Sequence, residues 1–220
     1  MQDQTDAGTD VQPSTEDNRG LLGFSLAYPG ENGWETPLIG AILFLFSWLI
    51  IPLFIVAGYF VRLTRAAGRG EPDPPEFDDW GGMLVDGLLL IVVFIPIVVV
   101  YAIVVVVAAE IHEALGILVS FLALYPLPGA YMNYAVRDNW KAAYDVSTLG
   151  SQITTRTYLI GFLVYAFVIN GIGAIVAIVL LVLSLLTIVG WIILWPLIYF
   201  YWYGIDASLW GRVYARLESA

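Results

Sequence analysis

Carboxylates are the most concentrated reactive groups in this chain, and four of them lie in one short segment. Asp73, Glu76, Asp78 and Asp79 fall within seven residues. Hard cations bind such oxygens, but the spacing is not that of a calcium loop, and Pro74-Pro75 keeps part of the segment out of a helix. We interpret the segment as solvated, with Asp78 or Asp79 capping the start of a helix.

A second polar group contains both oxygen and nitrogen ligands that zinc accepts. It consists of Glu110, His112 and Glu113, but the chain has a single His and no Cys, so a working zinc site lacks its remaining ligands. The sequence also has no phosphate-binding glycine loop, dinucleotide fingerprint or nucleophile elbow. We therefore expect no enzymatic activity, no cofactor and no metal, and the absence of a basic surface indicates no nucleic-acid partner.

Three prolines and one asparagine could form a polar site inside an apolar region. Pro52, Pro96 and Pro126 fall near the middle of long apolar runs, and Asn170 interrupts another. A proline frees a backbone carbonyl, and transporters use such breaks for substrate or ion sites at the membrane midplane. The alternative is that these prolines are ordinary kinks, which are common in membrane helices.

The elements that must carry these residues are membrane helices. Hydrophobic residues make up 60% of the 220 residues and charged residues only 13%, which is too little polar surface for a globule in water. Residues 1–19 are expected to be a disordered acidic tail and 20–36 an interfacial segment without a firm helix. Residues 37–216 are expected to be one all-α transmembrane helical bundle, with five spans at about 37–61, 84–109, 114–136, 157–186 and 191–210. The turn between the last two spans is placed near residues 187–190.

The charges predict an orientation and a source. With five spans, every cation after Arg19 lies on one side, which places the carboxyl terminus in the cytoplasm and the amino terminus outside the cell membrane. The chain has 19 Asp and Glu against 9 Lys and Arg, and a single lysine. Carboxylates keep a surface hydrated in molar salt, so this balance is typical of a haloarchaeal protein.

A short motif occurs twice and suggests a parallel internal repeat. Tyr-x-Val-Arg ends at Arg62 and again at Arg137. Each copy is followed by an acidic and aromatic segment that we expect to form a cytoplasmic interfacial helix leading into the next span, with pairs of aromatic residues on one face. The matching residues are Phe77, Asp78, Asp79, Trp80 and Asp86 in the first segment, and Asp138, Trp140, Tyr144 and Asp145 in the second.

The segment Pro74-Pro75-Glu76-Phe77-Asp78-Asp79-Trp80-Gly81 resembles the signature of an archaeal membrane family known as domain of unknown function 4013. Other matching pieces are Leu26-Ala27-Tyr28-Pro29, Gly58-Tyr59, Asn139-Trp140-Lys141-Ala142-Ala143 and Leu209-Trp210-Gly211-Arg212. The resemblance covers about residues 21–216. It implies a haloarchaeal origin and an integral membrane fold, and it implies no activity.

These observations favour a protein that works by contact rather than by catalysis. We expect an interaction or assembly component of the membrane, with the lipid bilayer and either further copies of itself or an unknown membrane protein as partners. The alternative is a small transporter or channel-like carrier that uses the proline breaks. Asp86 and Asp206, at the cytoplasmic boundary, are expected to pair with Arg62, Arg137 or Arg212 rather than bind a cation.

Overall fold

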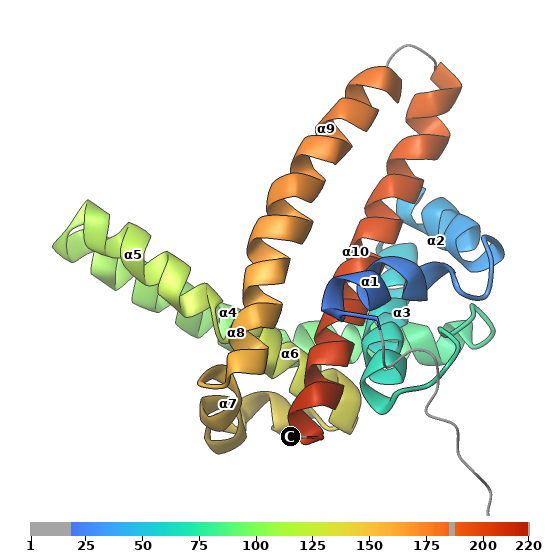
Figure 1. The fold of residues 1–220 in the computed structure, drawn as a ribbon. Helices are drawn as coiled ribbons and strands as arrows, with labels where there is room; N and C mark the ends of the chain where they lie inside the picture. Colours follow the sequence, from blue (N-terminus) through green and yellow to red (C-terminus); the bar gives the residue numbers. More distant parts are fainter. Residues whose placement is uncertain (1–18, 185–187, 220) are drawn as a thin grey trace, which may run out of the picture.

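The computed structural model describes residues 19–184 and 188–219, and within them every regular element is a helix (Figure 1). The predicted all-α class is therefore confirmed. Nearly all of the predicted acidic tail, residues 1–18, lies outside the described residues. The predicted last turn, at residues 187–190, also begins outside the described residues. The described chain stops at Ser184 and resumes at Ile188, in a helix that contains Gly190.

The described part of the first third of the chain contains four helical elements. They are α1 (Leu21–Ala27), the 3₁₀ turn η2 (Tyr28–Gly30), α2 (Glu35–Leu45) and α3 (Ile50–Arg69). The expectation that residues 20–36 lack a firm helix is wrong for α1. Pro29 falls beyond the end of this helix, and Leu21 and Phe24 are buried in its packing surface.

The first predicted span, residues 37–61, is two helices rather than one. The chain turns at residues 46–49, and Leu49 is extended with φ −82° and ψ 131°. Pro52 lies in the first turn of α3, where a missing N–H removes no intrahelical hydrogen bond. Pro52 therefore begins a helix instead of bending one at its middle.

The remaining two thirds of the described chain contain the longest helices. They are α4 (Trp80–Ile111), α5 (Glu113–Leu124), α6 (Leu127–Arg137), the 3₁₀ turn η3 (Trp140–Tyr144), α7 (Val146–Ile153), α8 (Arg156–Leu163), the π-helix η4 (Val164–Ile172), α9 (Gly173–Ser184) and α10 (Ile188–Glu218). Pro126 lies near the middle of the apolar segment Glu113–Arg137, as predicted, at the point where α5 gives way to α6. Pro96 does lie inside a helix, α4.

Close contact between backbones holds the centre of the molecule together. α3 packs against α4 and α10. A Cβ added at Gly58 of α3 would lie 1.8 Å from the carbonyl oxygen of Met83, and one at Gly87 of α4 would lie 1.9 Å from that of Phe54. Because glycine has no side chain, the backbones of two membrane helices can come into direct contact at these positions. The α3–α4 crossing therefore depends on Gly58 and Gly87.

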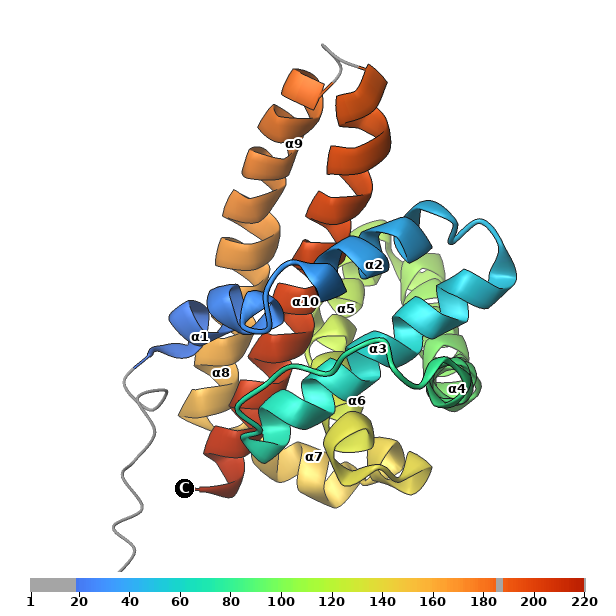
Figure 2. The ribbon, with the colours of Figure 1, turned by 90° about the vertical axis from the view of Figure 1, so that its right-hand side faces the viewer.

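Two helical hairpins extend from this centre in different directions. The α4–α5 hairpin and the α9–α10 hairpin diverge in Figure 1, and Figure 2 shows α4 almost end-on while α10 runs along the page. Four helical segments of the described chain are long and apolar enough to cross a membrane: Ile50–Arg69, Trp80–Ile111, Glu113–Arg137 and Arg156–Ser184. α10 contains the fifth predicted span.

These apolar segments differ in how much protein covers them. Half of the most apolar part of α3 is buried within the chain, but almost none of α4 or of the segment from α8 to α9 is. Large exposed side chains follow one another along α4 and α9, including Val99, Val100, Ile175 and Ile178. Surfaces of this size require an apolar environment.

The two predicted interfacial helices have different outcomes. Residues 77 and 78 form a turn, and Trp80 is the first residue of α4, so no separate helix precedes the second span. The helix starts there because Asp79 caps it, and it then continues uninterrupted to Ile111. After Arg137, in contrast, η3 and α7 do form two short helical elements before α8. The two halves of the predicted repeat therefore differ in their connecting elements.

Candidate functional site: an arginine and aspartate network beside a buried carboxylate

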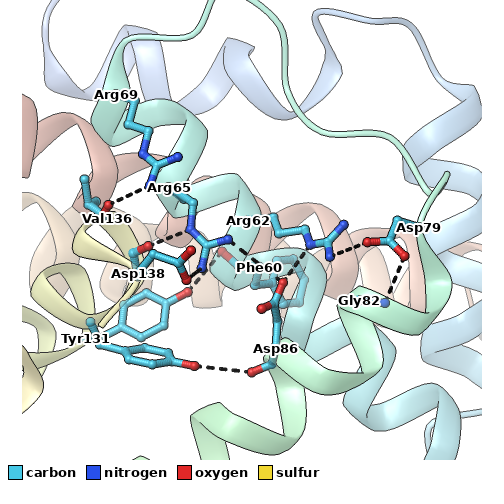
Figure 3. A network of polar contacts seen from close by, with 12 residues as sticks. Phe60, Arg62, Arg65, Arg69, Asp79, Gly82, Asp86, Tyr131, Val136 and Asp138 are labelled. Atoms are coloured by element: carbon cyan, nitrogen blue, oxygen red, sulfur yellow. Dashed lines mark hydrogen bonds and ion pairs between the residues drawn. The ribbon is translucent and has the colours of Figure 1, made fainter. Parts of the chain in front are cut away.

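Arg62 of α3 pairs with two aspartates at the start of α4. Its Nε lies 2.7 Å from Oδ2 of Asp86, and its Nη2 lies 2.8 Å from Oδ2 of Asp79 (Figure 3). Asp79 and Asp86 are seven residues apart and so lie on one side of α4. The structure thus pairs Asp86 with Arg62, one of the three partners named from the sequence.

Asp79 also caps α4, as the sequence suggested for Asp78 or Asp79. Its Oδ1 accepts a hydrogen bond from the Gly82 amide at 2.9 Å. The Arg62 guanidinium, followed by this amide, holds the pKa of Asp79 below its ordinary value. A Cβ at position 82 would lie 2.2 Å from Arg62 Nη2, so glycine leaves room for the ion pair. Asp78 is exposed.

Arg65 and Arg69 connect the same face of α3 to the end of α6. Arg65 donates to the carbonyl of Ala135 at 2.9 Å and pairs with Asp138 at 2.6 Å, while Arg69 donates to the carbonyl of Val136 at 3.2 Å. Cations are favourable at a helix carboxyl end, where the last carbonyls lack partners. Asp138 ends α6 in the left-handed region, with φ 51°.

Arg137, in the second copy of the motif, joins α6 to α7 and α10. Its guanidinium lies 3.6 Å from Asp145 and 3.8 Å from Glu218, and it donates to the hydroxyl of Tyr214 at 3.1 Å. Asp145 caps α7 by accepting from the amide of Thr148 at 3.1 Å and from its hydroxyl at 2.6 Å. These two bonds lower the pKa of Asp145.

The aromatic residues of each segment stay close together but differ in burial. The ring centroids of Phe77 and Trp80 lie 6.0 Å apart, and those of Trp140 and Tyr144 lie 6.3 Å apart. Phe77 is only 8% exposed and stacks on Tyr59 with ring centroids 4.6 Å apart, whereas Trp80 is 44% exposed. A turn at residues 77 and 78, in place of a helix, buries Phe77 and leaves Trp80 at the surface. In the second segment Trp140 is exposed, and the hydroxyl of Tyr144 donates to the carbonyl of Val93 in α4.

The candidate midplane residues do not gather in one place. A cavity of about 930 Å³ lies between α4, α5, α6, α8, η4 and α10, and Asn170 in η4 lines it. Pro52, Pro96 and Pro126 are not among the described residues that line this cavity; Pro128 is. The side chain of Asn170 donates to the carbonyl of Tyr165 at 2.9 Å, within the π-helix.

Asp206 of α10 also lines this cavity, and its environment differs from the expected one. Its Oδ1 is buried without a hydrogen-bond partner, and no Lys or Arg of the described residues forms an ion pair with it. The expectation that Asp206 pairs with Arg62, Arg137 or Arg212 is therefore wrong. Arg62 and Arg137 are occupied by other acids, and the guanidinium of Arg212 lies 4.8 Å over the ring of Phe24.

Three other polar residues make contacts that no clear sequence pattern predicted. Asn133 and Gln152 exchange two side-chain hydrogen bonds, at 2.8 and 2.9 Å, and join α6 to α7. His112 serves as the cap of α5, with its Nδ1 accepting from the amide of Ala114 at 3.1 Å. The sequence indicated these residues only as polar side chains inside or beside an apolar run.

These features define an all-α protein with membrane-length apolar helices tied together at one end by paired arginines and aspartates. The model of a family described as a protein of unknown function, DUF4013, matches residues 43–187 of this chain. The chain belongs to that family. Comparison with curated proteins and with solved structures finds no match.

Proposed function

We propose that this protein is a multi-pass component of the cell membrane that acts without catalysis, by assembling with other membrane chains. The observation that supports the proposal is that its charged residues pair with one another. Arg62, Arg65 and Arg137 pair with Asp79, Asp86, Asp138 and Asp145, so the groups most able to do chemistry are occupied in joining the four helices α3, α4, α6 and α7. A network of this kind supports a rigid base.

The apolar hairpins supply the surfaces for assembly. α9 exposes Ile175, Val176, Ile178, Val179 and Val182 on more than one side. Lipid can cover all of these residues, but a second chain would cover one stripe of them. The partner we favour is a second copy of this chain, because symmetric self-association needs no other component.

The acidic composition and the position of the cations support a location and a source. We infer a haloarchaeal cell membrane, with the arginine and aspartate network on the cytoplasmic side. We infer the same side for the described amino-terminal end, because Arg216 donates to the carbonyl of Arg19 at 3.4 Å and α1 packs on α10. The expectation that Arg19 and Arg216 face opposite sides of the membrane is therefore withdrawn.

Cysteine cross-linking in membranes tests the assembly proposal directly, because the native chain has no Cys. Single cysteines at positions 175, 176, 178, 179 and 182 should give dimer cross-links that recur every three or four residues, as one face of a helix does. A cysteine in place of the buried Val61 is the matched control and should give none. Equal cross-linking at all five positions, or none at any, would show that lipid alone covers α9.

A further inference from the structure

The cavity beside Asp206 combines a large volume with aromatic walls. It measures about 930 Å³, within the range of cavities that hold small organic molecules. Its walls include Phe94, Phe121, Tyr131, Tyr165 and Trp210. A smaller cavity of about 280 Å³ shares Tyr131, Leu90 and Asp206 with it. Asp206 thus lies where two cavities meet.

The carboxylate of Asp206 is the one acidic group among the described residues that line either cavity. The indole of Trp210, one turn further along α10, is its hydrogen-bonding neighbour, yet Oδ1 remains buried without a partner. A carboxylate removed from water without a cation is strongly disfavoured. Such a group either takes up a proton or is stabilised by a positive charge beside it, and no Lys or Arg among the described residues supplies that charge.

The surroundings of the carboxylate discriminate between kinds of cation. A metal ion such as Na⁺ or Ca²⁺ needs about six oxygen ligands. The hydroxyl of Tyr131, which lines the same two cavities as Asp206, already contacts Thr64 Oγ1 and the carbonyl of Phe60, each at 3.0 Å. Aromatic faces, in contrast, attract organic cations, whose charge is spread over apolar groups. The size and the apolar walls of the cavity fit such a molecule.

We propose that the cavity between α4, α6, η4 and α10 binds a monovalent lipophilic organic cation, with Asp206 as its counter-charge and the aromatic residues as its walls. The ligand class is a quaternary ammonium or phosphonium centre that carries apolar groups. Binding at this site is independent of the assembly proposed above. Either proposal can fail while the other holds.

Equilibrium binding of radiolabelled tetraphenylphosphonium to the full chain in detergent tests the site. We expect saturable binding, with affinity reduced at least about tenfold in Asp206→Asn because the charge is removed and the shape is kept. Glu71→Gln removes an exposed acid outside both cavities and should bind as the parent does. Neutral triphenylphosphine oxide should not displace the probe.

A second variant keeps the test decisive if Asp206→Asn does not fold. Leu124→Trp adds bulk to a half-exposed wall residue at the end of α5 and should reduce binding while Asp206 stays in place. Absence of saturable binding to the folded parent, equal affinity in the parent and Asp206→Asn, or equal displacement by the neutral oxide would each overturn the proposal.

Discussion

At the scale of single residues, Asp86 shows how charge is kept at the end of an apolar helix. Its side chain is 16% exposed and that of Arg62 is 20% exposed, so both charges are largely removed from water. Such a pair is tolerated when the geometry is good and the remaining hydrogen bonds are made. Arg65 lies 4.0 Å from the same carboxylate, so Asp86 balances two arginines.

Removing the charge of Asp86 should therefore destabilise the fold. We expect Asp86→Asn to lower the free energy of unfolding by about 1–3 kcal/mol, because Arg62 stays largely buried with a weaker partner. The exposed Asp78→Asn should change it by less than about 0.5 kcal/mol. Denaturant unfolding in detergent gives both values, and equal effects of the two substitutions would contradict the role of the network.

The two capping aspartates should make stability depend on pH in the acid range. Folding lowers the pKa of Asp79 and Asp145 below their ordinary value of 3.8, so their contribution is present above that value and is lost as pH falls through the folded pKa. The double variant Asp79→Asn with Asp145→Asn should be less stable than the parent at about pH 6, and the difference should disappear near pH 2. Thermal unfolding across this range measures it; a difference independent of pH would contradict the assignment.

At the scale of elements, the α3–α4 crossing is decided by where glycines fall. Gly87 faces the backbone of α3, whereas a Cβ at Gly81, also in α4, would meet nothing within 4 Å. The same residue type in one helix thus has two different roles. Only the first is required by close packing.

This contrast gives a matched pair of substitutions. Gly87→Ala should lower the free energy of unfolding by about 2–3 kcal/mol, because its methyl group would overlap a backbone carbonyl that cannot move aside by itself. Gly81→Ala should leave stability unchanged or raise it by up to about 1 kcal/mol, because alanine favours the helix. Equal thermal midpoints for the two variants in detergent would show that α3 and α4 are not in contact at Gly87.

At the scale of the whole molecule, the described helices form three hairpins that begin and end at the same end of the molecule. α2 and α3 form the first, α4 to α6 the second, and α8 to α10 the third. The connecting segments 70–79 and 138–155 and both described ends lie near the network. The described amino-terminal end is held there by an ion pair of Arg19 with Glu31, at 2.7 Å, and by its contact with Arg216.

This arrangement predicts a topology with both described ends on the cytoplasmic side. Single cysteines at positions 20, 141 and 218 should react with a membrane-impermeant maleimide only after the cells are opened. A cysteine at position 113, in the turn between α4 and α5, should react in intact cells. Labelling at position 20 but not at 141 in intact cells would restore the opposite placement of the amino-terminal end.

The sequence by itself determined the helical class, the long apolar segments and the cap at the start of α4. Length, hydropathy and capping residues act locally, so they can be read from neighbouring positions. The pairing of Asp86 with Arg62 was also among the expected outcomes, because opposite charges at the ends of neighbouring helices attract each other.

The tertiary structure alone decided how the first apolar run divides, where Phe77 points and what surrounds Asp206. Pro52 is compatible with a helix start or a kink, and only the packing of α2 and α3 on α10 selects the start. Phe77 is buried because Tyr59 offers it a ring from another helix. Asp206 has no ion-pair partner among the described residues because distant helices direct the arginines elsewhere, and no local pattern contains that information.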